Sequence, residues 1–155
     1  AWQSTQKLTD DEYNQGVKRL KAAAVIQYTL PGVPSLFYGD EAGVQGYGDP
    51  FCRATYPWGN ENRELLQFYK DLGSLRKNCK AFISGDFYTT FADDNAIAYI
   101  RKTKTSSVFV AVNRGDNAMN ITVPDEFLNC KSAFGNSVNS NVITLKKCQY
   151  TILYK

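Results

Sequence analysis

The sequence predicts an α+β chain in which a helix–strand–helix unit is followed by an all-β antiparallel sandwich. Two observations predict this fold. Before residue 80, apolar residues recur at helical spacing on either side of one short, continuous apolar run. After it, short runs of alternating apolar and polar residues are separated by turn-forming residues. We therefore expect two unlike parts, residues 1–79 and residues 80–155.

The first helix is expected to begin after Thr9 and to end at Pro31. Thr9 and Glu12 have the spacing of a capping box, in which each side chain bonds the backbone of the other residue. Asp10 and Asp11 complete an acidic first turn, which the positive end of the helix dipole favours. The apolar stripe predicted for this helix consists of Tyr13, Val17, Leu20, Ala24 and Tyr28.

A short apolar run follows at residues 33–38, with the sequence VPSLFY. It shows no alternation, which is typical of a strand buried on both faces, as in a parallel sheet. Residues 39–59 are expected to form a long loop, since they contain five of the 11 glycines. A loop of this length in a compact protein is usually functional. A second helix is predicted over residues 62–77.

The second part is predicted to be a series of short strands. Turn signals such as Asp93-Asp94-Asn95 separate them, and Asp is favoured there because it bonds its own backbone. Lys146-Lys147 is expected to be a solvent-exposed turn. Strands at this spacing predict an antiparallel sandwich. The strands are expected at residues 81–91, 96–102, 107–113, 120–123, 131–134, 142–145 and 150–154.

Composition excludes several classes of function. The net charge of +3 is too small to indicate nucleic-acid binding. No apolar run approaches the ~18–20 residues that a membrane span needs. The chain has no His, which excludes His-dependent triads and His-ligated metal sites within it. We therefore expect no metal, no cofactor, and no nucleic-acid or membrane partner.

The four cysteines are Cys52, Cys79, Cys130 and Cys148. Their spacings are wide and contain no C-x-x-C, which argues against a structural zinc site. A hairpin between Cys130 and Cys148 would allow a disulfide, but free thiols are favoured because nothing in the sequence signals secretion. A cytoplasmic location is expected on the same ground. Secretion remains the alternative, since a mature secreted chain would also lack its signal.

Two stretches resemble the alpha-amylase family of glycoside hydrolases. Residues 31–43, PGVPSLFYGDEAG, resemble the family's segment at the eighth barrel strand. Residues 48–53, GDPFCR, followed by Tyr56-Pro57-Trp58, resemble the loop after that strand in the neopullulanase, cyclomaltodextrinase and maltogenic amylase branch. The resemblance implies that residues 1–79 form the last helix–strand–helix unit of a (β/α)8 TIM barrel. Residues 80–155 would then be the C-terminal sandwich domain.

The resemblance also implies what the chain lacks. The family's retaining hydrolysis uses an Asp nucleophile, a Glu general acid/base and a second Asp, all upstream of the matched segment. A full barrel takes about 250 residues. We therefore expect the C-terminal portion of a glycosidase with no catalytic residue of its own, inactive without the upstream barrel of the same polypeptide. Its substrates would be α-glucans such as cyclodextrins, pullulan and malto-oligosaccharides. The alternative is a stand-alone glucan-binding or scaffold module.

The resemblance implies that Asp49 and Arg53 line the cleft and bond sugar hydroxyls, which suits a carboxylate and a guanidinium. An internal Asp49–Arg53 ion pair that shapes the loop is equally expected, and the two roles are compatible. Tyr47, at a Gly-flanked tip, is a candidate for stacking on glucose rings. Aromatic residues of the sandwich are expected to be core residues rather than a sugar-binding surface.

Three further residues are expected to support the loop. Asp40 and Glu41 follow a predicted strand, so their side chains should point to opposite faces and not converge on one glycosidic bond. Glu41 is expected to be buried and hydrogen-bonded. Trp58, next to Pro57, is expected to anchor the second helix by packing. If the predicted strand is left uncovered, we expect self-association, and hence a homo-oligomer.

Overall fold

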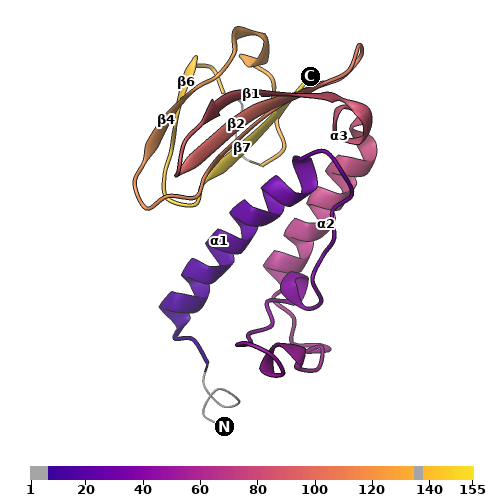
Figure 1. The fold of residues 1–155 in the computed structure, drawn as a ribbon, viewed down its shortest axis with the longest axis vertical. Coiled ribbons are helices and arrows are strands. Elements are labelled where there is room, and N and C mark those ends of the chain that lie inside the picture. Colours follow the sequence, from indigo (N-terminus) through magenta and orange to yellow (C-terminus); the bar gives the residue numbers. More distant parts are fainter. Residues whose placement is uncertain (1–6, 135–137) are drawn as a thin grey trace.

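The computed structural model describes residues 7–134 and 138–155. Helices α1 (Asp10–Thr29) and α2 (Arg63–Asn78) lie side by side below two antiparallel sheets (Figure 1). The capping box of α1 is confirmed: Thr9 Oγ1 accepts from Glu12 N–H at 3.4 Å, and Glu12 Oε2 accepts from Thr9 N–H at 2.9 Å. At the start of α2, Asn62 Oδ1 accepts from Leu65 N–H at 3.0 Å. The first helix therefore begins where its capping box predicts, and the second begins one residue after the predicted start at residue 62.

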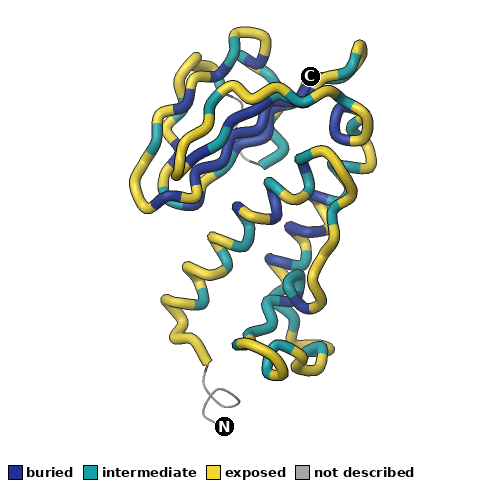
Figure 2. The backbone as a smooth tube through the Cα atoms, viewed as in Figure 1, coloured by how far each residue is buried: buried dark blue, intermediate teal, exposed yellow. Residues whose placement is uncertain are grey.

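The predicted strand at residues 33–38 is wrong for this structure. The segment is irregular and Val33 is 93% exposed, so it appears in Figure 2 as part of an exposed stretch beside α2. An apolar run becomes a strand buried on both faces only where neighbouring strands flank it. No strand pairs with it in the described ranges, so the helix–strand–helix unit is not observed there.

The first predicted strand begins later than expected. Residues 80–84 form a short helix, α3 (Lys80–Ser84), and strand β1 (Asp86–Ala92) follows. Ala81 and Phe82 are both fully buried in the core between the helices and the sheet. Successive residues of a strand point to opposite faces, so a helical turn is the conformation that buries both against one core.

The remaining predicted strands are present with small shifts in their bounds. The larger sheet is antiparallel with the order β1-β2-β3-β7-β5, and β4 pairs with β6 in a second sheet. Asp93 Oδ1 accepts from the backbone of Asn95 and Ala96 at 2.8 and 2.6 Å, as the turn signal predicted. The strands are β2 (Ala96–Lys102), β3 (Ser107–Asn113), β4 (Met119–Thr122), β5 (Lys131–Ser132), β6 (Val142–Leu145) and β7 (Tyr150–Tyr154).

Two cores lie on the two faces of the larger sheet. Val108, Val110 and Val112 of β3 pack against the helices, whereas Phe109 and Ala111 pack toward the smaller sheet. The antiparallel sandwich is therefore observed, and α1, α2 and α3 cover the face of the larger sheet that points away from the smaller sheet. The helix–sheet core takes side chains from both predicted parts, and the division at residues 79 and 80 stays a prediction.

Arginines from other elements cap the C-terminal end of α1, whose last turn has no basic residue. Arg101 of β2 is only 2% exposed, and it donates to Thr29 O at 2.9 Å and to Gly85 O at 2.8 Å. Arg76 of α2 donates to the carbonyls of Tyr28, Leu30 and Gly32. These bonds satisfy carbonyls that the helix leaves open.

The hydroxyl of Tyr99 contacts Thr29 Oγ1 at 2.5 Å beside Arg101. Burial raises the pKa of Tyr99 to about 12 and lowers the pKa of Arg101. Tyr99 and Arg101 are two residues apart in β2, so they share one face of the strand. Their burial against α1 ties the sheet to the helices by hydrogen bonds as well as by packing.

Two further findings concern the state of the cysteines and the length of the helices. Cys130 and Cys148 are free thiols in the structure, and so are Cys52 and Cys79. Among the helices of the described ranges, none is both long enough and apolar enough to cross a membrane.

Candidate functional site

The base of the loop at residues 39–59 is held between the starts of α1 and α2. The Tyr13 hydroxyl donates to Gly43 O at 3.3 Å and accepts from Asn62 Nδ2 at 3.0 Å. Asn62 N–H donates to Ala42 O at 3.0 Å. Gly43 has a φ of 71°, and a Cβ there would lie 2.2 Å from the Tyr13 hydroxyl oxygen. Only glycine fits, so the loop leaves this junction in a defined direction.

Asp49 and Arg53 form the predicted ion pair. Arg53 Nε lies 2.6 Å from Asp49 Oδ1, across the 3₁₀ turn Phe51–Arg53. The side chains of Arg53 and Asp49 are 75% and 62% exposed, respectively, and an ion pair this exposed contributes only about 0–1 kcal/mol to stability. The peptide bond between Asp49 and Pro50 is cis. The ion pair is confirmed, and its exposure leaves both charged groups accessible to hydroxyl groups of a ligand.

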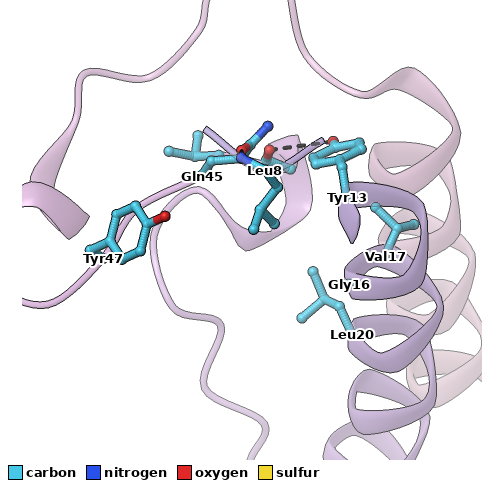
Figure 3. Close-up of a pocket in the computed structure, with 10 residues that line it drawn as sticks. Leu8, Tyr13, Gly16, Val17, Leu20, Gln45 and Tyr47 are labelled. Atoms are coloured by element: carbon cyan, nitrogen blue, oxygen red, sulfur yellow. Dashed lines mark hydrogen bonds between the residues drawn. The ribbon is translucent and has the colours of Figure 1, made fainter. Parts of the chain in front are cut away.

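Tyr47 lines a small apolar pocket between the loop and the start of α1. Figure 3 shows it across this pocket from Val17 and Leu20. Leu8 closes the pocket beside the loop, where its N–H donates to Gln45 Oε1 at 2.9 Å. The volume is about 170 Å³, below the ~300 Å³ at which small-molecule sites usually begin. This pocket is therefore a packing contact of the loop, and stacking of Tyr47 on a sugar stays a prediction.

Asp40 and Glu41 lie in a 3₁₀ turn, Asp40–Ala42, and not at the end of a strand. The expectation that they point to opposite faces of a sheet therefore does not hold. Burial, and then the charge of Glu41, raises the pKa of Asp40. Their support of the loop stays a prediction.

The expected hydrogen bonding of Glu41 is not fully observed. Its Oε2 atom is buried and has no hydrogen-bond partner in the described ranges. Its charge is felt by Tyr28, Tyr56 and Tyr69, whose pKa values are raised first by burial and then by nearby charges that include Glu41. None of these phenols donates to Glu41 Oε2, so the carboxylate acts on them through its charge alone.

Trp58 does not anchor α2. Its side chain is 82% exposed, and its ring lies 4.6 Å from the ring of Tyr56. The ring centroids of Tyr56 and Tyr38 are 6.1 Å apart, and the Tyr38 hydroxyl donates to Ala54 O at 3.1 Å. Trp58 lies inside the turn that Asn60 N–H closes on Pro57 O at 2.8 Å, ahead of the start of α2 at Arg63. Trp58 therefore contacts the loop itself, and the sequence did not identify Tyr38 as part of this aromatic row.

Metal binding has no support from side-chain geometry. Within residues 7–134 and 138–155, no group of three or more His, Cys, Asp or Glu side chains could hold a metal ion.

Comparison with known proteins supports the family that the sequence motifs indicated. No family model matches the chain. The amylopullulanase of Thermoanaerobacterium saccharolyticum is 35% identical over 136 residues, which are 80% of this chain and 11% of that protein. The cyclomaltodextrinase of Thermoanaerobacter pseudethanolicus is 38% identical over 102 residues, 64% of this chain and 18% of that protein. The chain is related to the alpha-amylase family of glycoside hydrolases.

Solved structures of alpha-amylase family enzymes have the same fold as this chain. An Anoxybacillus alpha-amylase superposes with a TM-score of 0.76 at 23% identity, covering 89% of this chain and 32% of that one. A debranching enzyme from Nostoc punctiforme gives 0.77 at 25% identity, covering 90% and 31%. The antiparallel sheet matches the C-terminal domain of these enzymes.

The relatives also bear on the branch indicated by the loop motif. Neopullulanase 2 of Thermoactinomyces vulgaris is 35% identical over 103 residues, 63% of this chain and 18% of that protein. Cyclomaltodextrinases and a maltogenic alpha-amylase are similar as well, so the recognition of the alpha-amylase family is confirmed. The chain spans less than a fifth of the length of each of these relatives.

Proposed function

We propose that the chain is the C-terminal portion of a retaining glycoside hydrolase that acts on α-1,4-linked glucans, with α-1,6 links as a further target. It contributes Asp49 and Arg53 to one wall of the substrate cleft, and it is inactive alone. The observation that carries the proposal is the exposed Asp49–Arg53 pair on its long loop, in a chain related to glucan-hydrolysing enzymes.

The chemistry of the pair suits a sugar. A carboxylate accepts hydrogen bonds from neighbouring hydroxyls, and a guanidinium donates several bonds in a fixed plane. The ion pair uses Nε and Oδ1 and holds the two side chains together in solvent. A pair that is already assembled loses less conformational entropy on binding than two free side chains.

The acidic pairs that the sequence offers lie in settings that argue against catalysis by this chain alone. Retaining hydrolysis needs two of them about 5–5.5 Å apart at the scissile bond. Asp93 is engaged with the backbone of its turn, and Asp10 and Asp11 lie in the first turn of α1. Asp40 and Glu41 lie in the half-buried 3₁₀ turn at the loop base. The turn pair and the helix pair therefore have structural settings that account for them, and the pair at the loop base is expected to support the loop.

The exposed segment at residues 33–38 supports an upstream barrel as the partner. Val33, Leu36, Phe37 and Tyr38 are all exposed apolar or aromatic side chains in one short segment. Monomeric proteins seldom expose such a contiguous patch. An upstream barrel of the same polypeptide would cover it. Without that cover we expect the chain to self-associate, and a clean monomer by light scattering would count against this part of the proposal.

The test measures binding of β-cyclodextrin to the chain by titration calorimetry. We expect the double variant Asp49→Asn/Arg53→Gln to weaken binding about tenfold or more, since it removes charge-assisted hydrogen bonds. The matched control is Asp94→Asn/Lys104→Gln, which removes one acid and one base at exposed positions elsewhere. Equal affinity of all three proteins would contradict the assignment of the site.

A hydrolysis assay tests the second half of the proposal. Pure chain of verified mass is incubated with pullulan and with β-cyclodextrin, and reducing ends are measured. We expect no turnover above the blank. Turnover by the chain alone would show that the catalytic carboxylates lie within it. Binding without turnover, in a chain that is monomeric, would instead favour the glucan-binding module.

A further inference from the structure

We propose that a lysine-lined hollow between α1 and the β6–β7 turn binds a small sugar phosphate. Lys18 and Lys21 line it from α1, and Lys146 and Lys147 line it from the turn. The two segments are more than 120 residues apart in the sequence, so only the fold brings their ammonium groups to one hollow. The β6–β7 turn belongs to the sheets at the upper end of Figure 1, whereas the 39–59 loop lies at the lower end.

The positive charge around this hollow is incompletely neutralised. Lys21 pairs with Glu64 at 2.5 Å, and Lys147 pairs with Asp116 at 2.7 Å. Asp116 also lies 3.8 Å from Arg19, so one carboxylate serves two cations. Over residues 7–134 and 138–155, the side chains of Lys18 and Lys146 form no ion pair within 4 Å. These groups therefore carry a local excess of positive charge.

The excess at the hollow is two positive charges. Four lysines line it, and Glu64 and Asp116 pair with two of them. Lys18 and Lys146 are the two ammonium groups left over, one from α1 and one from the turn.

Cations around a concave surface attract an anion, because low-dielectric walls focus their field. A phosphate monoester carries close to two negative charges at neutral pH and accepts several hydrogen bonds, so ammonium groups from two sides suit it. The sequence predicted only a solvated turn at Lys146-Lys147, and the proximity of α1 is what allows that turn to bind a ligand.

The wall of the hollow indicates what the phosphate is attached to. Tyr150 and Phe134 line it, and both rings are partly buried against Phe68, so this wall adds apolar ring surface beside the lysines, which suits the C–H groups of a sugar. The Tyr150 hydroxyl is protonated at neutral pH, as in any tyrosine, and burial raises its pKa further, to about 12. The hollow measures about 450 Å³, within the ~300–1,000 Å³ usual for small-molecule sites. A single phosphorylated sugar fits this space.

The test titrates the chain with glucose 1-phosphate, and in separate arms with inorganic phosphate and with glucose. We expect glucose 1-phosphate to bind more tightly than either, with an affinity that falls as salt is added. The variant Lys18→Gln/Lys146→Gln removes the two unpaired ammonium groups and should weaken binding about tenfold. The control Lys70→Gln/Lys104→Gln makes the same charge change at exposed positions outside the hollow and should bind as the unchanged chain does.

Three outcomes would overturn the inference. They are no saturable binding of glucose 1-phosphate, an equal loss in both double variants, and phosphate binding as tight as that of the sugar phosphate. Lys18 and Lys146 are exposed, and unchanged thermal unfolding of both variants would confirm that they fold. The inference is independent of the glucan-binding proposal, because neither variant alters Asp49 or Arg53.

Discussion

Residues 33–38 and strand β3 (Ser107–Asn113) are two short apolar segments that differ in burial. In β3 every residue is buried, whereas Val33 is 93% exposed. The difference lies in their neighbours: β3 pairs with β2 and β7, and it has helices on one face and the smaller sheet on the other. Burial stabilises an apolar run, but the run is buried only where neighbouring strands and helices cover it.

The largest expected effect tests this contrast directly. Phe109→Ala removes a fully buried ring that lies 5.8 Å from Phe127 in the core between the sheets. We expect the free energy of unfolding to fall by about 3–5 kcal/mol, from lost burial and the cavity left behind. Phe37→Ser, in the exposed segment, should change it by no more than about 0.5 kcal/mol. Urea denaturation measures both, and similar losses from the two variants would show that the two segments do not differ in burial as described.

A second prediction concerns the junction of helices and sheet. Arg101→Met removes the donors to Thr29 O and Gly85 O and should cost about 2–4 kcal/mol, since both carbonyls lose charged partners. Arg101→Lys keeps the charge but not the planar fork, and it should recover only part of this loss. Unfolding is followed by helix ellipticity and by aromatic fluorescence. An unchanged unfolding midpoint for Arg101→Met would show that the hydrogen bonds of Arg101 do not contribute measurably to stability.

The next effect is smaller and lies at the start of α1. Thr9→Ala removes the side-chain oxygen that accepts from Glu12 N–H, and we expect a loss of about 1 kcal/mol. Gln15→Ala, at an exposed position inside the same helix, serves as the control and should have little effect. A thermal midpoint that is the same for both variants would show that this end of the helix unfolds independently of the rest.

The smallest predicted effect is a dependence on pH at the loop base. The pKa of Asp40 is raised in the folded chain by burial and by Glu41, so folding favours its protonated form. Its contribution to stability is full below the unfolded pKa of about 3.9 and is lost as pH rises through the folded pKa. Asp40→Asn should therefore be at least as stable as the unchanged chain at neutral pH. Urea denaturation at pH 7 measures this, and a less stable variant would contradict the raised pKa of Asp40.

Much of the candidate site was visible in the sequence because it rests on local spacing. The Asp49–Arg53 pair is separated by four residues across one turn, and Thr9 and Glu12 by three, so their contacts need no distant partner. The sites that were missed join distant segments. Tyr13 meets Gly43 and Asn62 at the loop base, and the row of Tyr38, Tyr56 and Trp58 depends on the exposed path of residues 33–38.

Local patterns along the chain were enough to place the helix starts and to give the order and spacing of most strands. These features follow from backbone hydrogen bonding and side-chain period over a few residues. The contacts between distant segments were needed to show that β3 is buried on both faces, that Arg101 bonds the end of α1, and that Lys146 lines one hollow with Lys18. Burial and charge proximity depend on which distant segments meet, and no local pattern records that.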